Sequence, residues 1–432
     1  MLCKILERII VEHVTDHLII NELQSSEPNG FTKGKSTVTN LLEAMNIWTE
    51  SLQHNIPIDI IFLDYAKAFD TVPHCRLIRQ VQRFGIGGTL LKWLEDFLHG
   101  RRQKVQVNGA VSGWVPVCSG VPQGSVIGPM LFSLFVNDCP KLIDSIMSLF
   151  ADDTKLYAAL SLSLGETSSI QTDLDKLQDW ANMMCMRFHP DKCRTMHMGS
   201  NNPQQDYSMK TDTGEVHILE STTEEKDLGV TIDNKLTFTT HVNQVVQKSN
   251  KVMGMLRRTF SHIDKEIFCQ LYKSLVRPHL EYASVVWNPP TVQLRTKLEQ
   301  VQRRATKMVP RLRDLTYERR LQELNLPTLA YRRRRADIIQ MFKILKNLDH
   351  LQQDCRCTVC PGKNMFSIVH SVSTRGHPYK IRVQHAQGVR SKFFATRSIA
   401  VWNSLPGNIV CTNAVNELKT ALKYYPHEKS LM

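Results

Sequence analysis

The chain has 432 residues, of which 42% are hydrophobic and 22% are charged. This composition excludes a disordered protein and leaves room for about two to four domains with a sizeable core. An excess of 54 Lys and Arg over 41 Asp and Glu gives a formal charge of +13 and a pI near 9.2. A phosphate backbone is the usual partner of such a surplus, and an anionic membrane is the alternative.

Two features of the sequence, its targeting signals and its cysteine pattern, indicate the cellular compartment of the protein. No apolar run reaches the roughly 18 residues of a membrane span, and the first residues, MLCKILERIIVEHV, carry charges where a signal peptide is apolar. The 11 cysteines are an odd number spread over a long chain, which does not fit a disulfide framework. We therefore expect an intracellular protein, nuclear or cytoplasmic, that is not secreted and has no membrane partner.

The first third of the chain is predicted to be mostly helical with one buried strand. Apolar residues recur at helical spacing through residues 1 to 100, apart from a continuous apolar run at 58 to 63. Such a run is typical of a strand covered on both faces. Polarity then alternates from 104 to 117 around Asn108-Gly109, the strongest hairpin signal in the chain, before a helix predicted at about 128 to 137.

Carboxylates follow two of the predicted strands. Asp64 comes directly after the first strand, and strands at 146 to 150 and 155 to 159 flank a turn that contains Asp152 and Asp153. A sheet that joined these strands would bring the three acids together. Carboxylate oxygens are hard ligands for Mg²⁺, which drives phosphoryl transfer. The alternative for each motif alone is a plain strand end and an ordinary polar turn.

The second half is predicted to be largely helical. A helix is expected at 173 to 186, a loop at 201 to 208, a short strand at 228 to 232 and helices from 241 to 348. Within the last region, apolar residues at steps of three and four leave one basic face, which is a candidate contact for phosphates. Its members are Arg303, Arg304 and Lys307.

A glycine-rich loop, Ser119-Gly-Val-Pro-Gln-Gly-Ser125, separates the acidic segments, and its backbone could approach a base pair or phosphate closely. In the order LDYAKAFD, SGVPQGSVIGP and FADDT, the three segments resemble motifs A, B and C of reverse transcriptases. The resemblance is strongest to non-LTR retrotransposons of the LINE class, in the jockey and chicken-repeat branch. It extends to NGFTKGKST, FHPDKC, EKDLGVTID, LYKSLVRPHLEYASVVW, LEQVQRRATKMV and KFFATRSIAVWNSLP.

The resemblance implies an α+β fold: a right-hand polymerase palm made of a small antiparallel sheet with packed helices, partial fingers, a helical thumb-like region and a C-terminal tail. The expected boundaries are partial fingers and palm at 1–200, a primer-grip hairpin region at 201–245, the thumb-like region at 246–348, and at 349–432 a loosely ordered tail with a compact end.

The resemblance also assigns roles to individual residues. Asp64, Asp152 and Asp153 match the catalytic, metal-binding aspartates, and Lys192 matches the lysine that assists pyrophosphate departure. Phe69 matches the steric gate against a ribose 2′-hydroxyl, for which a core aromatic is the alternative. Gln123 and Gly124 match the loop that contacts nucleotide and template. The primer-grip turn is matched by Lys226, Asp227, Leu228 and Gly229.

Departures from the family pattern limit these expectations. Thr32 stands where relatives often carry arginine, which leaves Lys33 or Lys35 as the nearest cation for the triphosphate, and His189 replaces an asparagine. The endonuclease and the Arg-Pro-Ile-Ser fingers segment of full-length relatives do not precede Lys4, so we interpret the chain as a 5′-truncated element. The implied cofactor is Mg²⁺, with Mn²⁺ as the alternative. The implied partners are an RNA template, a DNA primer and dNTPs, with no defined protein partner.

Two weaker patterns and three hypotheses remain open. Cys355, Cys357 and Cys360, near His350 and His370, form either a zinc site or ordinary cysteines, because their spacing lacks a clear second half. The run Arg332 to Arg335 is a phosphate contact, a nuclear-targeting patch or a solvated face. The chain itself is an RNA-directed DNA polymerase, a catalytically inactive nucleic-acid-binding remnant of one, or an unselected translation of a genomic copy.

Overall fold

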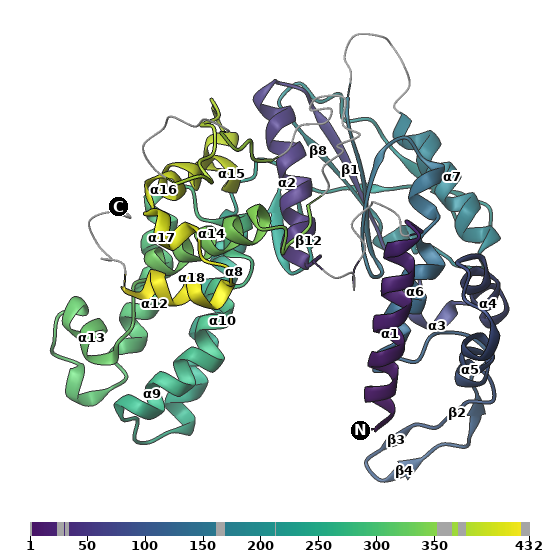
Figure 1. Cartoon of the computed structure of the whole chain (residues 1–432), viewed down its shortest axis with the longest axis horizontal. Helices are drawn as coiled ribbons and strands as arrows, with labels where there is room; N and C mark the ends of the chain where they lie inside the picture. The colour runs from purple at the N-terminus through teal and green to yellow at the C-terminus, as the bar shows by residue number, and fades with distance from the viewer. Residues whose placement is uncertain are drawn as a thin grey trace. The chain divides into compact units, whose positions relative to one another are not determined.

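The computed structural model describes residues 2–23, 30, 34–160, 169–211, 213–351, 365–369 and 377–424. They form two compact units, described separately below (Figure 1). Unit 1 takes its described residues from Met1–Asn40 and Ile56–Thr222, and unit 2 from Leu41–Asn55, Thr223–Asp354 and Gly362–Met432. Helix α2 (Thr37–Gln53) contributes to both. In the part of the chain that the structure describes, no helix has the length and apolarity needed to cross a membrane.

Unit 1 is built on a five-stranded sheet with the order β11-β8-β1-β7-β6. Its strands are β1 (Ile58–Leu63), β6 (Ile146–Phe150), β7 (Asp153–Ala159), β8 (Arg194–Met198) and β11 (Glu220–Ser221). All neighbours pair antiparallel except β11 and β8. The central strand is β1, and five of its six residues are buried. The prediction of a strand covered on both faces is therefore confirmed, because the buried residues of β1 include members of both alternating sets.

Helices of unit 1 pack around this sheet. They include α1 (Leu2–Ile20), α3 (Ala68–Thr71), α4 (His74–Arg83), α5 (Gly88–Leu98), α6 (Gly128–Val136) and α7 (Ser169–Met183). Helix α4 packs against both α5 and α6. The first turn of α6 is capped by a distant carboxylate: Glu7 Oε2 accepts hydrogen bonds from the N–H groups of Val126 and Ile127 at 2.5 and 3.1 Å. This cap ties α1 to the segment that enters α6.

A two-level hairpin projects from the end of α5 (Figure 1). The outer level pairs β3 (Gln106–Val107) with β4 (Ala110–Val111), and the inner level pairs β2 (Arg102–Gln103) with β5 (Val115–Pro116). Asn108 and Gly109 form its tip with φ of 50° and 86°. Positive φ at both positions is what a tight hairpin turn requires, so the predicted hairpin is confirmed.

A buried carboxylate lies near the start of β1. The Asp59 side chain is fully buried, and three side chains surround it. Tyr207 donates its hydroxyl hydrogen to Oδ2 at 2.6 Å, Asn202 donates to Oδ1 at 2.8 Å, and His197 Nδ1 lies 2.7 Å from Oδ1. Because a buried charge without partners is very costly, this network is what permits an acid in the centre of the sheet.

Unit 2 is mainly helical, as predicted. After the hairpin β12 (Glu224–Asp227) and β13 (Val230–Asp233) come α8 (Thr239–Thr259), α9 (Lys265–Leu271), a π-helix (Tyr272–Val276), α10 (Arg277–Glu281), α11 (Ser284–Trp287), α12 (Val292–Thr306), α13 (Tyr317–Leu324), α14 (Leu329–Leu345), α15 (Phe394–Arg397), α16 (Ile399–Ser404), α17 (Gly407–Val410) and α18 (Val415–Tyr424). The strand predicted at 228 to 232 begins only at Val230, because Leu228 and Gly229 form the turn.

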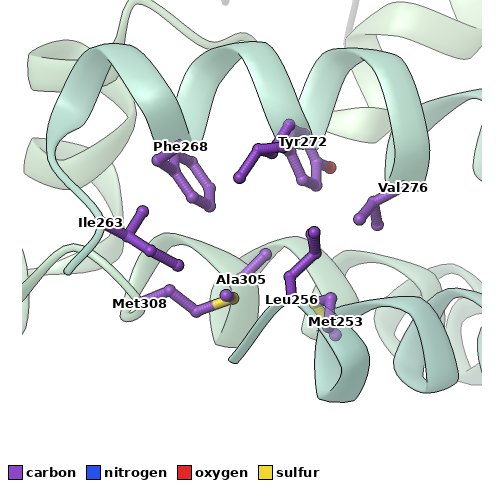
Figure 2. A pocket seen from close by; sticks show the side chains of 9 residues that line it. Met253, Leu256, Ile263, Phe268, Tyr272, Val276, Ala305 and Met308 are labelled. Atoms are coloured by element: carbon purple, nitrogen blue, oxygen red, sulfur yellow. The ribbon is translucent and has the colours of Figure 1, made fainter. Parts of the chain in front are cut away.

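A small apolar pocket lies under the π-helix of unit 2 (Figure 2). Phe268, Tyr272 and Val276 line one side, and Leu256 and Met308 are among the residues that line the other. The Tyr272 hydroxyl donates to Gln302 Oε1 at 2.7 Å. With no charged side chain in its lining, the pocket offers packing space rather than catalytic groups.

The end of the chain packs onto the helical part of unit 2. Arg397 donates two hydrogen bonds to the buried carboxylate of Asp337, at 2.8 and 3.0 Å, and a third to the Val285 carbonyl. Trp402 in the same part of the chain is fully buried, and its indole N–H donates to the Tyr379 carbonyl at 2.8 Å. The candidate zinc ligands Cys355, Cys357, Cys360 and His370 lie outside the described residues. The zinc site therefore remains a hypothesis from the sequence.

Candidate active site

The three aspartates share one edge of the unit 1 sheet. The antiparallel register ends with Leu63 paired to Thr154, and Asp64 and Asp153 are the residues next to this last pair on the two strands. Asp152 precedes it in the tight turn between β6 and β7, next to Ala151, which has a φ of 58°. Asp152 and Asp153 are exposed, and the Asp64 side chain is 47% exposed. Strand pairing thus joins acids that are 88 residues apart in the sequence (64 to 152).

The donor chemistry of this edge fits a hard divalent cation, because three carboxylates from adjacent strand ends supply only oxygen ligands. In the structure, however, the three carboxylates do not converge on one point. Among the described residues, no three His, Cys, Asp or Glu side chains are close enough together to hold a metal ion. The backbone therefore brings the aspartates to one edge, and their role as metal ligands remains a prediction.

Lys192 lies beside Asp64. Its Nζ is 3.4 Å from Asp64 Oδ2, and both side chains are open to solvent. A short 3₁₀ turn (Pro190–Lys192) presents the lysine, and the His189 N–H anchors this turn by donating to the Asp64 carbonyl at 2.8 Å. His189 thus contributes its backbone to the site. Burial raises the pKa of the adjacent Cys193 thiol to about 11, so this thiol is neutral where it meets the Asp64 N–H.

The glycine-rich loop is bound to the segment that follows Asp64. The N–H groups of Gly120 and Val121 donate to the carbonyls of Val72 and Phe69, both at 2.8 Å. Gly120 has a φ of 90°, and a Cβ there would lie 2.8 Å from the Asp70 backbone, so only glycine fits. Burial lowers the pKa of His74, which keeps the ring neutral while its Nε2–H donates to the Gly120 carbonyl.

Phe69 belongs to the segment after Asp64 and Gln123 to the glycine-rich loop, the two segments that are in contact. The Phe69 ring is partly buried and stacks on the fully buried Phe132, with centroids 4.7 Å apart. Gln123 is exposed and donates from Nε2 to Asp70 Oδ1 at 2.9 Å. Gly124 is also exposed, with open space where a Cβ would stand. The ring at 69 is thus fixed on one face, and the 123–124 segment remains open to solvent.

The segment that carries the proposed triphosphate cations is only partly described. Lys33 lies outside the described residues, and Lys35 is half-buried just before α2. Gly30 packs its backbone against the turn between β6 and β7: a Cβ there would lie 2.7 Å from the Ala151 nitrogen. This contact joins the N-terminal segment to the turn that holds Asp152.

The predicted primer-grip turn belongs to unit 2. Leu228 and Gly229 have φ of 45° and 82°, and the Tyr282 hydroxyl donates to the Leu228 carbonyl at 2.8 Å. A Cβ on Gly229 would lie 3.1 Å from the Tyr282 ring. Lys226 is exposed, whereas Asp227 is buried. Tyr282 therefore fixes the shape of this turn.

The basic face predicted on α12 is exposed. Arg303, Arg304 and Lys307 point to solvent opposite the buried Leu298, Val301 and Ala305. The Arg303 guanidinium lies 4.6 Å from the centroid of the Tyr317 ring. The helical periodicity is as predicted, and the role in nucleic-acid contact remains a prediction.

The basic run at 332 to 335 is packed into unit 2. Arg332 forms a bidentate pair with Glu281, Arg333 donates to Asn288, and Arg335 donates to the Lys419 carbonyl. Burial lowers the pKa of Arg333 to about 10. The alternative of a solvated face is therefore wrong for most of this run.

Three residues that support the candidate site are not indicated by the sequence motifs. Glu7 caps the entry to α6, Asp70 holds Gln123, and Tyr282 holds the primer-grip turn. Asp70 could have been noticed as the second acid in LDYAKAFD, because a carboxylate beside a functional segment needs a partner. Glu7 and Tyr282 act across long separations in the chain and leave no local signal.

Comparison with known proteins adds an independent result. Residues 1–253 match the model of the reverse transcriptase (RNA-dependent DNA polymerase) family. The chain is 28% identical to the RNA-directed DNA polymerase from mobile element jockey of Drosophila melanogaster, over 66% of this chain and 32% of that protein. It is 27% identical to the Drosophila funebris counterpart, over 74% and 35%.

The chain thus spans about a third of the length of the curated relatives it matches. Among solved structures, telomerase from Candida albicans in complex with a telomeric RNA fragment aligns with 79% of this chain and 51% of that chain. Its sequence identity is 11% and its TM-score is 0.38.

Proposed function

This chain belongs to the reverse transcriptase (RNA-dependent DNA polymerase) family, and we propose that it extends a DNA primer on an RNA template with dNTPs, as the polymerase of a non-LTR retrotransposon. The observation that supports this proposal is the β1–β7 register, whose last pair, Leu63 with Thr154, directly adjoins Asp64 and Asp153. The docked glycine-rich loop beside Phe69 supports it, because nucleotide selection and phosphoryl transfer must occur side by side.

In this proposal Asp64, Asp152 and Asp153 hold Mg²⁺, with Mn²⁺ as the alternative. The bound ions would lower the pKa of the attacking 3′-hydroxyl and neutralise charge on the phosphates. Lys192, next to Asp64, supplies a proton or positive charge to the departing pyrophosphate. Carboxylates that converge on a metal repel one another, so the lysine ammonium next to Asp64 also reduces the negative charge of this edge.

Phe69 is proposed as the sugar gate. Its stack on Phe132 leaves the ring little freedom to move aside, so a ribose 2′-hydroxyl would collide with it. Gln123 and Gly124 contact the nucleotide and template, and Lys33 or Lys35 contacts the triphosphate. In unit 2, the turn of Lys226, Asp227, Leu228 and Gly229 contacts the primer, and the exposed cations of α12 contact phosphates.

An intracellular location, nuclear or cytoplasmic, is part of the same proposal. Eight cysteines lie among the described residues, and all of them are free thiols. Free thiols of which several are exposed fit a reducing compartment.

A primer-extension assay tests the function. Purified protein is incubated with poly(rA), oligo(dT), dTTP and Mg²⁺, and incorporation is compared with that of Asp152→Ala. We expect incorporation by the wild-type protein and none by the variant, while both bind the duplex. Binding without incorporation by the wild-type protein would identify an inactive nucleic-acid-binding remnant. Incorporation that survived the substitution would contradict the site assignment.

A further inference from the structure

The hairpin that projects from α5 is an exposed arm without an assigned role. Every residue from 101 to 116 is exposed. The arm is nevertheless ordered by its own hydrogen bonds, since Ser112 and Val105 bond each other twice and the Val117 N–H donates to the Arg101 carbonyl. We call residues 101–117 the arm.

The arm exposes large apolar side chains that folding normally removes from water. Trp114 is 61% exposed, and Val105, Val107, Val111 and Val115 are also exposed. All six tryptophans of the chain lie among the described residues, and the other five are buried or half-buried. So many large apolar side chains left in water on one short segment indicate a surface that binds a partner, with Trp114 as its largest member.

The charge of the arm indicates the kind of partner. Arg101, Arg102 and Lys104 lie within it, and it contains no Asp or Glu. The Lys104 ammonium lies 4.8 Å from the centroid of the Trp114 ring, and the Arg101 guanidinium lies 5.6 Å from that of Phe97. Cations are therefore grouped beside flat aromatic faces. A second copy of the chain would oppose these three charges with three of its own, which disfavours self-association through the arm.

A single-stranded nucleic acid matches both features. An unpaired base can stack on an exposed indole, while the adjacent phosphates contact the neighbouring cations. A duplex cannot offer the face of an inner base in this way, because its bases are already stacked. We propose that the arm binds single-stranded nucleic acid through base stacking on Trp114 and phosphate contacts from Arg102 and Lys104. This binding needs neither the aspartates nor polymerase activity.

Tryptophan fluorescence tests the proposal directly, because Trp114 is the side chain of its type most open to a ligand. The full chain, without Mg²⁺ or dNTPs, is titrated with oligo(U) and separately with a blunt duplex. We expect quenching by oligo(U). Trp114→Ala should abolish the quenching and weaken oligo(U) binding about 10-fold, with duplex binding unchanged. Trp114→Phe should retain most of the affinity, since it keeps an aromatic face.

Salt dependence separates the role of the cations. The double variant Arg102→Gln and Lys104→Gln should reduce the slope of log affinity against log salt by about 1.4, at roughly 0.7 per phosphate on a single strand. Lys92→Gln, at an exposed position on α5 outside the arm, is the matched control and should leave the slope nearly unchanged.

Several outcomes would overturn the proposal. One is unchanged oligo(U) affinity in Trp114→Ala; another is equal weakening of duplex binding, which would show that the arm contacts phosphates alone. Concentration-dependent self-association that disappeared in Trp114→Ala, with nucleic-acid binding intact, would instead assign the arm to a contact between copies. Because the readout is binding, loss of primer extension in the wild-type protein would not affect this test.

Discussion

The two ends of strand β1 each present an aspartate, and the two side chains have opposite surroundings. Asp59 is fully buried and is surrounded by His197, Asn202 and Tyr207. Asp64 lies half in solvent with Lys192 as its neighbour. Both acids belong to the same short segment, IDIIFLD, in which composition alone does not distinguish them.

The difference shows how one strand can serve stability and chemistry at once. Protein donors already occupy the oxygens of Asp59, so this carboxylate can stabilise the sheet but has little capacity for an external ligand. The Asp64 side chain is partly open to solvent at the same end of the sheet as Asp152 and Asp153. Burial and hydrogen-bond partners, rather than residue type, therefore separate a structural acid from a catalytic candidate.

The largest expected effect is the loss of activity when Asp64, at the exposed end of β1, is replaced. Asp64→Ala should reduce primer extension by about 1000-fold or more, because the substitution removes a proposed principal metal ligand. Its effect on stability should stay within about 0.5 kcal/mol, since an exposed ion pair contributes little. Steady-state incorporation and thermal unfolding measure the two quantities. Wild-type incorporation by this variant would remove Asp64 from the site.

The same substitution at the buried end should reverse this pattern. Asp59→Ala removes the acceptor of Tyr207 and the partner of His197, although Asn202 keeps the carbonyls of Ile58 and Met198, and it should destabilise unit 1 by about 3 kcal/mol. The chain has two units and need not unfold in one step, so hydrogen exchange of the β1 and β8 amides is the suitable measurement. Folded molecules of this variant should keep nearly full activity per active site. Unchanged exchange rates would contradict a structural role for Asp59.

A smaller effect is expected when one member of the buried network is trimmed. Tyr207→Phe removes only the hydroxyl that donates to Asp59, and it should cost about 1 kcal/mol by the same exchange measurement. Activity should be unchanged. Tyr65→Phe is a matched control. The Tyr65 ring is also buried, but it lies next to Asp64 at the other end of β1, away from Asp59. Equal destabilisation by both variants would mean that ring packing, rather than the hydrogen bond to Asp59, is being measured.

Much of this arrangement could be predicted from local patterns. The continuous apolar run that became β1, the Asn108-Gly109 turn and the helical spacing on α12 all depend on residues close together in the sequence. The family was recognised from three short motifs and the order in which they occur. Local geometry determines such features, so a single sequence carries them.

The remaining features depend on contacts between distant segments. Nothing near Asp59 in the sequence indicates that Tyr207 will satisfy it, and nothing in the run at 332 to 335 shows that Glu281 and Asn288 will bind two of its arginines. The strand expected at 228 to 232 was wrong at its start, because the Leu228-Gly229 turn is held by Tyr282 from a later helical segment. Tertiary partners, which periodicity does not report, determined each of these outcomes.

Two glycines described above set a limit on how freely this sequence can vary. A methyl group at position 30 would meet the Ala151 nitrogen at 2.7 Å, and one at position 120 would meet the Asp70 backbone at 2.8 Å. In a mutational scan, replacement by alanine at either position should therefore be as damaging as the loss of an acid, although neither glycine has any reactive group. The reactive edge depends on these two close backbone contacts as well as on its charges.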